Sequence, residues 1–493
     1  LQITAAALVC LTFIATFMSV RSYHAEQIAK QKRQEAESLL GFMVGEFADK
    51  LRSVKRMDLL DGISNKALEY FTNQDEEAAS LFDFSDKQAE FNNRFQYAQT
   101  LEAMGEVAYS RGKTDEAFTA FDNARTRLES LLKIQPNNLD VLMLAGANAF
   151  WLGQLNFDNS DYTGAEPWIK RYQEHSKQMY TLAPNDFNSI MELSYSYNSL
   201  GSLYLKQFDY ALAKQNFTES LKLKNQALEL KPNNKNLLRD KTDTISWIAS
   251  TEENLGHFNE ALKIFEHAEN ETNKMLTKYP ADASVLTSLA YKHIQQSYLL
   301  SYFPDKSKSY EKAKQATETI NKARLQDVQN KTIERTYYQF LAYQLSLSDN
   351  PNIDNRVSEI IEFLGTNKSS NRQVIGTKIS LIEYFINRNN IKRALDLLKS
   401  LDENNVLSSA LDIDNARLHT RILLIKARLA KSQQEKNSLC EDAATTLNKI
   451  SKKTKSIKFT YPLIQAYTCL NKSHEIEATI VPVRELGIIN FQL

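Results

Sequence analysis

Histidine and carboxylate side chains are the first candidates for chemistry in this chain of 493 residues. Its seven histidines are scattered from His24 to His474, and none lies in an H-E-x-x-H or C-x-x-C context that would assemble a metal site. Glu76 and Glu77 lie in a charged run, whereas general acid catalysis needs a pocket that the sequence does not predict. P-loop, G-x-G-x-x-G and G-x-S-x-G sequences are also absent. We therefore expect no enzyme activity, metal or cofactor in this chain.

The balance of charge argues against one class of partner. The chain has 60 Lys and Arg residues and 60 Asp and Glu residues. A protein that binds nucleic acid presents an excess of basic charge. We expect no nucleic-acid partner for this part of the protein.

Two of the three cysteines are candidates for a redox-dependent bond. Cys10 lies in an apolar run, while Cys440 and Cys469 lie symmetrically about the centre of a helical hairpin whose loop is 451–456. Their side chains are therefore expected to face each other. Such a pair forms a disulfide in an oxidising compartment and stays reduced in cytosol. Two unrelated buried thiols are the alternative, which the sequence leaves open.

Evenly spaced prolines mark a repeating unit in the elements that would carry a binding site. Pro136, Pro184, Pro232 and Pro280 follow one another at steps of 48 residues. Asn or Asp lies two residues after each proline and is expected to cap the next helix. A period of this length is typical of a solenoid, because a single helical hairpin cannot bury its apolar face without a neighbour.

The turn inside each unit resembles that of the tetratricopeptide repeat, with its G-x-(Y/F)-x-x-A pattern. The turns read SRGKTDEA, NSDYTGA, KQFDYALA and NLGHFNEA, and they lead to Ala117, Ala165, Ala213 and Ala261. The alanine precedes the proline by 19 residues rather than by about 12, so the second helices are expected to be long. The resemblance implies an all-α fold, a right-handed α-α superhelix built as a solenoid of 48-residue hairpins.

The repeat pattern divides the chain into segments. Four regular units are predicted over 90–300, degenerate repeats over 301–404, with alanines at Ala313 and Ala394, and a helical cap over 405–493. One transmembrane helix over 1–20 and membrane-proximal amphipathic helices over 21–89 are predicted to precede them.

The resemblance also implies a peptide-binding groove, because the first helices of such repeats line the concave face. The candidate groove residues are Glu102, Glu106, Tyr109, Phe150, Gln154, Phe157, Tyr195, Asn198 and Glu253. These residues are polar, aromatic and mildly acidic, and they lack the Lys and Asn clamp that holds a C-terminal carboxylate. We expect a protein or peptide ligand with apolar and basic residues. A solvated face without a ligand is the alternative.

The transmembrane prediction rests on the uncharged run LQITAAALVCLTFIATFMSV, which is as long as a bilayer span of ~20 residues. A cleaved signal peptide is the alternative. The chain begins with Leu inside this run, so we expect it to be truncated. Beyond it, apolar residues from Leu39 to Val54 recur on one helical stripe, which is expected to pack on the next helix or to form a homodimer through 22–54.

The segments EAESLLGFMVGEFADKL, VKRMDLLDGI and KALEYF resemble a region of bacterial proteins that join a serine/threonine kinase or winged-helix domain to tetratricopeptide repeats through one span. The resemblance implies a single-pass inner-membrane protein with periplasmic repeats. The basic residues after the span, taken alone, favour a cytoplasmic body. The leading hypothesis is a non-enzymatic, membrane-anchored scaffold or sensor that binds a protein or peptide. The alternative is the extracytoplasmic part of a kinase or transcriptional regulator whose N-terminal domain precedes residue 1.

Overall fold

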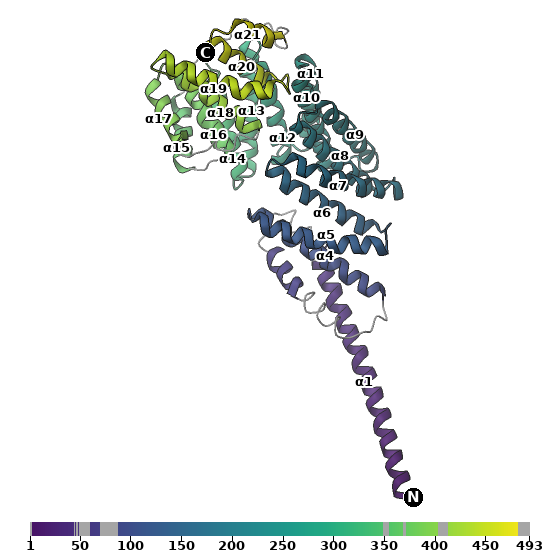
Figure 1. The fold of residues 1–493 in the computed structure, drawn as a ribbon. Coiled ribbons are helices and arrows are strands. Elements are labelled where there is room, and N and C mark those ends of the chain that lie inside the picture. The colour runs from purple at the N-terminus through teal and green to yellow at the C-terminus, as the bar shows by residue number, and fades with distance from the viewer. Residues whose placement is uncertain are drawn as a thin grey trace. The chain divides into compact units, whose positions relative to one another are not determined.

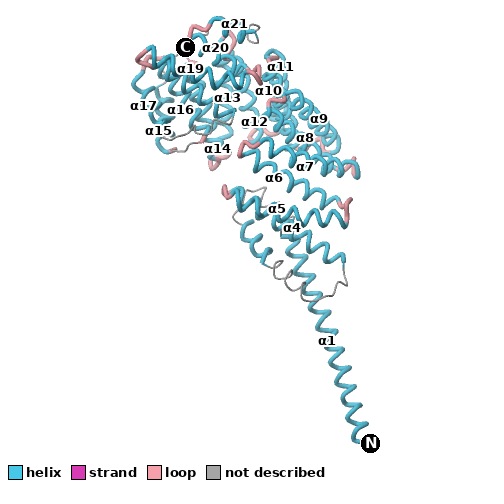
Figure 2. Tube along the Cα trace, viewed as in Figure 1, coloured by secondary structure: helices cyan, strands magenta, loops and turns pink. Residues whose placement is uncertain are grey.

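The computed structural model describes residues 2–43, 45, 48, 60–69, 87–348, 354–367, 371–402 and 413–481. Within these ranges the chain forms helices and short connections and contains no strand (Figure 2). The all-α part of the fold prediction is therefore confirmed for the part of the chain described. The chain divides into two compact units, Leu1–Pro184 and Asn185–Leu493, called unit 1 and unit 2 below.

Unit 1 begins with one long helix and continues as a stack of helical hairpins. Its helices are α1 (Gln2–Phe42), a short helix at 60–69, α4 (Lys87–Ser110), α5 (Thr114–Ile134), α6 (Leu139–Asp158) and α7 (Tyr162–Leu182). The helices from α4 to α7 each pack against the next in chain order (Figure 1). This is the order expected of antiparallel hairpins in a solenoid.

Unit 2 continues the same pattern of paired helices. Its first part consists of α8 (Phe187–Gln207), α9 (Tyr210–Leu230), α10 (Lys235–Leu255), α11 (Phe258–Lys278), α12 (Ala283–Leu300) and α13 (Lys306–Gln326). Its second part consists of α14 (Lys331–Ser346), α15 (Asp354–Thr366), α16 (Arg372–Asn387), α17 (Ile391–Asp402), α18 (Ile413–Leu429), α19 (Gln433–Ser451), α20 (Ile457–Cys469) and α21 (Ser473–Ile480).

The 48-residue step reaches one unit further than the prolines indicate. The second helices α5, α7, α9, α11 and α13 begin at equal steps, and each is 21 residues long. In the last of these helices the fully buried Ser309, rather than Ala313, lies at the repeat's alanine position. Val328 replaces the proline, while Asn330 keeps the cap. The fifth unit therefore stays in register although both of its marker residues have changed.

The predicted caps at the starts of the first helices are present. The side chain of Asn138 accepts a hydrogen bond from the backbone N–H of Val141, and that of Asn234 accepts one from Leu237, both at 3.1 Å. Asp186, Asp282 and Asn330 cap α8, α12 and α14 in the same way. Each cap satisfies a backbone donor that has no partner inside its helix.

Small residues allow the two helices of a hairpin to approach closely. A methyl group added at Gly201 would come within 2.7 Å of the ring of Phe217, and one added at Gly153 within 2.6 Å of Ile169. Phe217 is fully buried and Ile169 nearly so. The glycines therefore leave room for the large residue that follows each alanine of the repeat.

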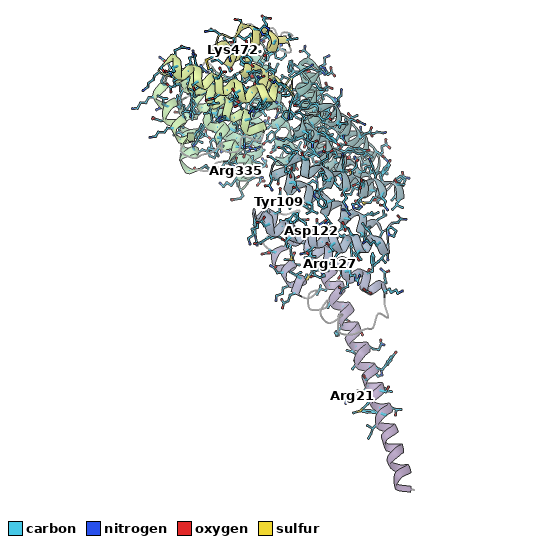
Figure 3. The ribbon with its side chains drawn as sticks, in the orientation of Figure 1. Arg21, Tyr109, Asp122, Arg127, Arg335 and Lys472 are labelled. Atoms are coloured by element: carbon cyan, nitrogen blue, oxygen red, sulfur yellow. A yellow bond between two sulfur atoms is a disulfide. The ribbon has the colours of Figure 1, made fainter. Side chains whose placement is uncertain are left out.

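The prediction of a transmembrane helix over 1–20 is corrected. No helix in the described ranges is long enough and apolar enough to cross a membrane. The apolar run is instead less than half of α1, which has 41 residues and continues through Arg21 and a charged stretch to Phe42 (Figure 3). The predicted single-pass inner-membrane location rested on this span and is corrected with it.

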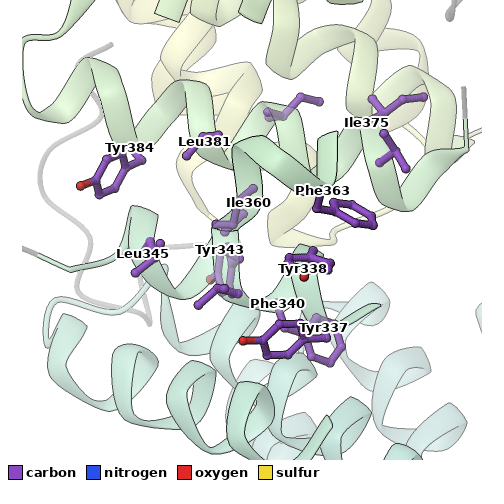
Figure 4. Packing of buried hydrophobic residues seen from close by; sticks show 14 of the residues in the cluster. Tyr337, Tyr338, Phe340, Tyr343, Leu345, Ile360, Phe363, Ile375, Leu381 and Tyr384 are labelled. Atoms are coloured by element: carbon purple, nitrogen blue, oxygen red, sulfur yellow. The ribbon is translucent and has the colours of Figure 1, made fainter. Parts of the chain in front are cut away.

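A hydrophobic cluster of unit 2 extends from α12 to α18, and Figure 4 shows its part on α14, α15 and α16. The rings of Tyr338 on α14 and Phe363 on α15 stack with 4.0 Å between centroids. Ile375 and Leu381 of α16 belong to the same cluster and are buried. Long-range packing thus keeps α14 and α16 adjacent although their connection no longer follows the 48-residue step.

Candidate functional site

Two of the predicted groove residues on α4 form hydrogen bonds with α6 of the same unit. Glu102 is buried and accepts a hydrogen bond from the Asn148 side chain at 2.8 Å, which links α4 to α6. Glu106 is half-buried. Tyr109, labelled in Figure 3, donates to Asp158 at 2.6 Å. Burial, and then this bond to a carboxylate, raises the pKa of Tyr109 to about 12. Glu102 therefore holds two helices together and is closed to a ligand.

The predicted groove residues on α6 are half-buried and pack on neighbouring rings. Gln154 donates to Asp158 at 2.7 Å, so it shares this carboxylate with the tyrosine of α4. Phe150 contacts the ring of Tyr172 edge to face at 5.9 Å, and Phe157 contacts that of Tyr162 at 5.2 Å. These two phenylalanines contribute to the packing of α6 on α7.

The predicted groove residues of unit 2 differ from one another in accessibility. Tyr195 is 40% exposed, and its hydroxyl lies 3.5 Å from Asp240. Asn198 is half-buried. Glu253 is only 2% exposed because the chain itself covers it. The Ser456 hydroxyl donates to Glu253 Oε1 at 2.5 Å, and the Lys458 ammonium lies 2.9 Å from Oε2.

The segment that covers Glu253 is 452–458, which reads KKTKSIK and consists of the loop after α19 and the first two residues of α20. The backbone N–H of Lys455 donates to the carbonyl of Asn254 at 3.1 Å. Ile457 and Ile464 pack in one cluster with Phe258 and Leu299. A basic and apolar ligand was expected at Glu253. This position is instead occupied by residues of the same chain, roughly 200 residues further on in the sequence.

A cavity of about 580 Å³ lies elsewhere in unit 2. Its walls come from α12, α14, α16, α18 and α20, which are the first helices of successive hairpins, and from the start of α13. Arg372 and Asn387 of α16 and Arg428 of α18 line it and are exposed, so they mark its opening to solvent. We call this space the α18 cavity.

Basic side chains dominate the lining of the α18 cavity. Among the described lining residues they are Lys306, Arg372, Arg417, Arg421, Arg428 and Lys458, against one carboxylate, Glu383. Arg421 donates through Nη2 to both oxygens of Glu383, at 2.8 and 2.7 Å. The attraction of Glu383 outweighs the effect of burial and raises the pKa of Arg421. The carboxylate of the cavity is therefore already paired.

Four tyrosines form much of the remaining surface of the cavity. The rings of Tyr298 and Tyr343 lie 4.5 Å apart, and those of Tyr302 and Tyr461 lie 5.2 Å apart. Burial raises the pKa of Tyr298 and of Tyr302, which keeps both hydroxyls neutral. Arg417 and Arg421 interact electrostatically with both of these hydroxyls. The cavity thus combines neutral hydroxyl donors with guanidinium groups.

The sequence predictions missed this site although α18 carries a signal for it. Arg417, Arg421 and Arg428 are separated by four and seven residues, which places them on one face of a helix. The predicted groove ended at residue 300, so these arginines were included only in a helical cap.

Cys440 of α19 and Cys469 of α20 form a disulfide. Their sulfur atoms lie 2.15 Å apart, and their Cα atoms 6.4 Å apart. Lys472, labelled in Figure 3, adds an ion pair to Glu441 of α19 at 3.0 Å. The C-terminal hairpin that borders the α18 cavity is therefore held by two side-chain links.

Other predictions for the N-terminal part stay untested. Phe47, Leu51 and Val54 of the predicted dimer stripe lie outside the described residues, while Leu39 is 60% exposed.

No group of three or more metal-binding side chains is found where the structure describes the chain.

One family model, described as Tetratricopeptide repeat, matches residues 194–227. The chain contains tetratricopeptide-type helical repeats. The matched range holds most of α8 and α9 with the turn between them, and it includes Gly201 and Ala213, which the sequence pattern singles out. No curated protein matches the chain.

Solved structures match the chain at low sequence identity and with low TM-scores. A thermophilic repeat protein of Thermus thermophilus is 16% identical, with 50% of this chain and 98% of that chain covered and a TM-score of 0.32. Aspartyl phosphate phosphatase F from Bacillus subtilis is 13% identical, with 67% and 74% covered and a TM-score of 0.44. The apo form of the quorum sensor NprR from B. thuringiensis is 13% identical, with 89% and 99% covered and a TM-score of 0.39.

Proposed function

We propose that this chain is a non-enzymatic repeat scaffold that binds a protein or peptide in the α18 cavity. The observation that carries the proposal is the cavity itself, which is lined by the first helices of successive hairpins. Its volume of about 580 Å³ lies within the range of roughly 300–1,000 Å³ of sites that enclose a ligand.

The lining of the cavity suits a polypeptide. Amide and hydroxyl side chains such as Gln339, Ser380 and Asn387 can pair with peptide groups of a ligand. Tyrosine rings offer apolar area together with a polar end, a combination common at protein interfaces. By contrast, the groove predicted over 90–300 is closed at Glu102 and Glu253, which the fold itself uses.

The lining also supports a binding role over catalysis. Among the described side chains that line the cavity there is no histidine or cysteine. Glu383, the one carboxylate among them, is held by Arg421. Histidine and free carboxylates are the commonest general bases, so this described lining favours binding.

Capture of peptides by the purified chain tests this function. A random heptapeptide library is passed over the immobilised protein, and the bound peptides are sequenced. We expect enrichment that Asn387→Trp abolishes, because an indole at this exposed lining position obstructs the opening. Asn448→Trp, on the exposed side of α19 and outside the cavity, is the matched control. Equal enrichment by both variants would reject the site, and appreciable ATP hydrolysis would reject the non-enzymatic part.

A second candidate rests on the segments EAESLLGFMVGEFADKL, VKRMDLLDGI and KALEYF. In this alternative the chain is the repeat part of a serine/threonine kinase or of a winged-helix regulator. The sequence upstream of Leu1 tests it. HRD and DFG motifs there would support the kinase, and a helix-turn-helix the regulator.

A further inference from the structure

The described lining of the α18 cavity carries more basic than acidic side chains. Arg421 pairs with Glu383, and Lys458 pairs with Glu253, which lies outside the lining. Among the described residues no second carboxylate lines the cavity beside Lys306, Arg417 and Arg428. Like charges held close together in a partly dry space repel one another, so a bound anion would stabilise this arrangement.

Arg417 carries a group that lacks a partner. Its Nε atom is buried, and none of the described groups accepts a hydrogen bond from it. A buried donor without an acceptor has lost its hydrogen bonds to water without compensation. An incoming carboxylate can pair with the guanidinium group of Arg417, which lines the cavity.

The surroundings of Arg417 extend this anion site. The hydroxyls of Tyr298 and Tyr302 lie within its electrostatic reach and are neutral donors. Arg428 lies on the same face of α18 at the opening of the cavity. A ligand with two separated carboxylates could thus be held at an inner and an outer guanidinium.

We infer that the peptide bound in the α18 cavity is acidic, with one carboxylate on Arg417, a second on Arg428, and an apolar side chain between them against the tyrosine rings. This inference rests on the proposed function and specifies its ligand. It reverses the charge of the partner expected for the predicted groove.

A peptide is favoured over a phosphate-bearing small molecule for one reason. Guanidinium groups bind phosphate as well as carboxylate, so the arginines alone do not distinguish the two. The cavity also presents several tyrosine rings and amide groups. Such a lining matches the mixed apolar, amide and carboxylate surface of a polypeptide.

The test uses three libraries of fluorescein-labelled heptapeptides in solution with the full chain. All three libraries share positions occupied by Leu, Tyr and Ser. The remaining positions hold Glu or Asp in the acidic library, Gln or Asn in the neutral library and Lys in the basic library. Fluorescence anisotropy measures binding. We expect the acidic library to bind at least tenfold more tightly than the neutral one, a difference that falls as the salt concentration rises.

Variants assign the binding to the cavity. Arg417→Gln and Arg428→Gln are each expected to weaken binding of the acidic library by roughly tenfold, the loss typical of a charged hydrogen bond. Lys449→Gln removes the same charge from an exposed position of α19 outside the cavity and should leave binding unchanged. Because Arg428 is exposed, its variant tests the site even if Arg417→Gln impairs folding.

The outcomes separate the inference from the proposed function. Tight binding of neutral or basic peptides that Asn387→Trp abolishes and the arginine variants do not affect would overturn the inference and keep the function. Failure of all three peptide libraries to bind would overturn both.

Discussion

Lys224 is a side chain whose charge opposes folding. It lies on α9, is only 2% exposed, and donates to the hydroxyls of Ser220 at 3.0 Å and Thr244 at 2.9 Å. Burial lowers its pKa from 10.5 to about 8, although Asp240 and Asp243 act in the opposite direction. The folded chain therefore releases this proton more readily than the unfolded chain does.

The sign of the resulting pH dependence follows from these two pKa values. Below pH 8 the lysine is charged in both states and the cost of burying the charge is fully present. Between pH 8 and 10.5 the unfolded chain binds more protons than the folded chain, so this contribution to stability rises with pH. We expect Lys224→Met to remove the rise and to increase the free energy of unfolding by about 1–3 kcal/mol near neutral pH.

Urea unfolding of the wild type and of Lys224→Met, at about pH 7 and at about pH 10, measures this effect. Lys222→Met, which changes an exposed lysine on the same helix, is the control. A difference between wild type and Lys224→Met that stays the same at both pH values would contradict the argument.

At the scale of the element, the start of α10 depends on one side chain. The Asn234 side chain accepts from the backbone N–H of Leu237, which would otherwise lack a partner. We expect Asn234→Ala to lower the free energy of unfolding by about 1 kcal/mol. Asn448→Ala, within the exposed face of α19, should cost nothing because alanine favours a helix interior. Thermal unfolding measures the stability of both variants. Equal losses of stability in Asn234→Ala and Asn448→Ala would contradict the role of the cap.

The packing of segment 452–458 on α10 depends in a similar way on one residue of α10. Glu253 accepts from Ser456 and pairs with Lys458, and all three side chains are largely buried. We expect Glu253→Gln to destabilise the docked loop by about 2 kcal/mol, since Lys458 loses its counter-charge. Hydrogen exchange should then speed up over residues 454–466 and stay unchanged in α8. Glu260→Gln, at an exposed site on α11, is the control. Unchanged exchange in Glu253→Gln would show that apolar contacts alone hold the loop.

At the scale of the whole molecule, the last hairpins of unit 2 lie outside the regular repeat and are joined covalently. The disulfide closes a loop over a sequence separation of 29 residues between Cys440 and Cys469. A cross-link that closes a loop of this length raises the free energy of unfolding by about 3 kcal/mol, because it restricts the unfolded chain. We expect the double change Cys440→Ser and Cys469→Ser to lower the melting temperature of unit 2 and to make α19 and α20 sensitive to mild proteolysis that the wild type resists. Alkylation followed by peptide mass measurement checks the bond, and alkylation of both Cys440 and Cys469 in the protein that has not been reduced would contradict it.

Sequence alone determined the repeated elements of this protein. Caps such as Asn234, the small residue Gly201 and the alanines of the second helices act within one hairpin, so their spacing is visible along the chain. The same locality explains why the repeat over 301–404 was predicted with Ala313, rather than Ser309, at the alanine position. Ser309 and Val328 perform the structural roles of alanine and proline without their residue types.

Only the tertiary structure decided where a ligand has room. Glu253 looked accessible because its covering residues, Ser456 and Lys458, lie roughly 200 residues further on. The α18 cavity arises for the same reason, since arginines of α18 meet tyrosines of α12 and α14 across a distance that no local pattern encodes. Contacts between distant hairpins determine which polar side chains the fold itself uses. These contacts follow from packing in three dimensions and not from spacing along the chain.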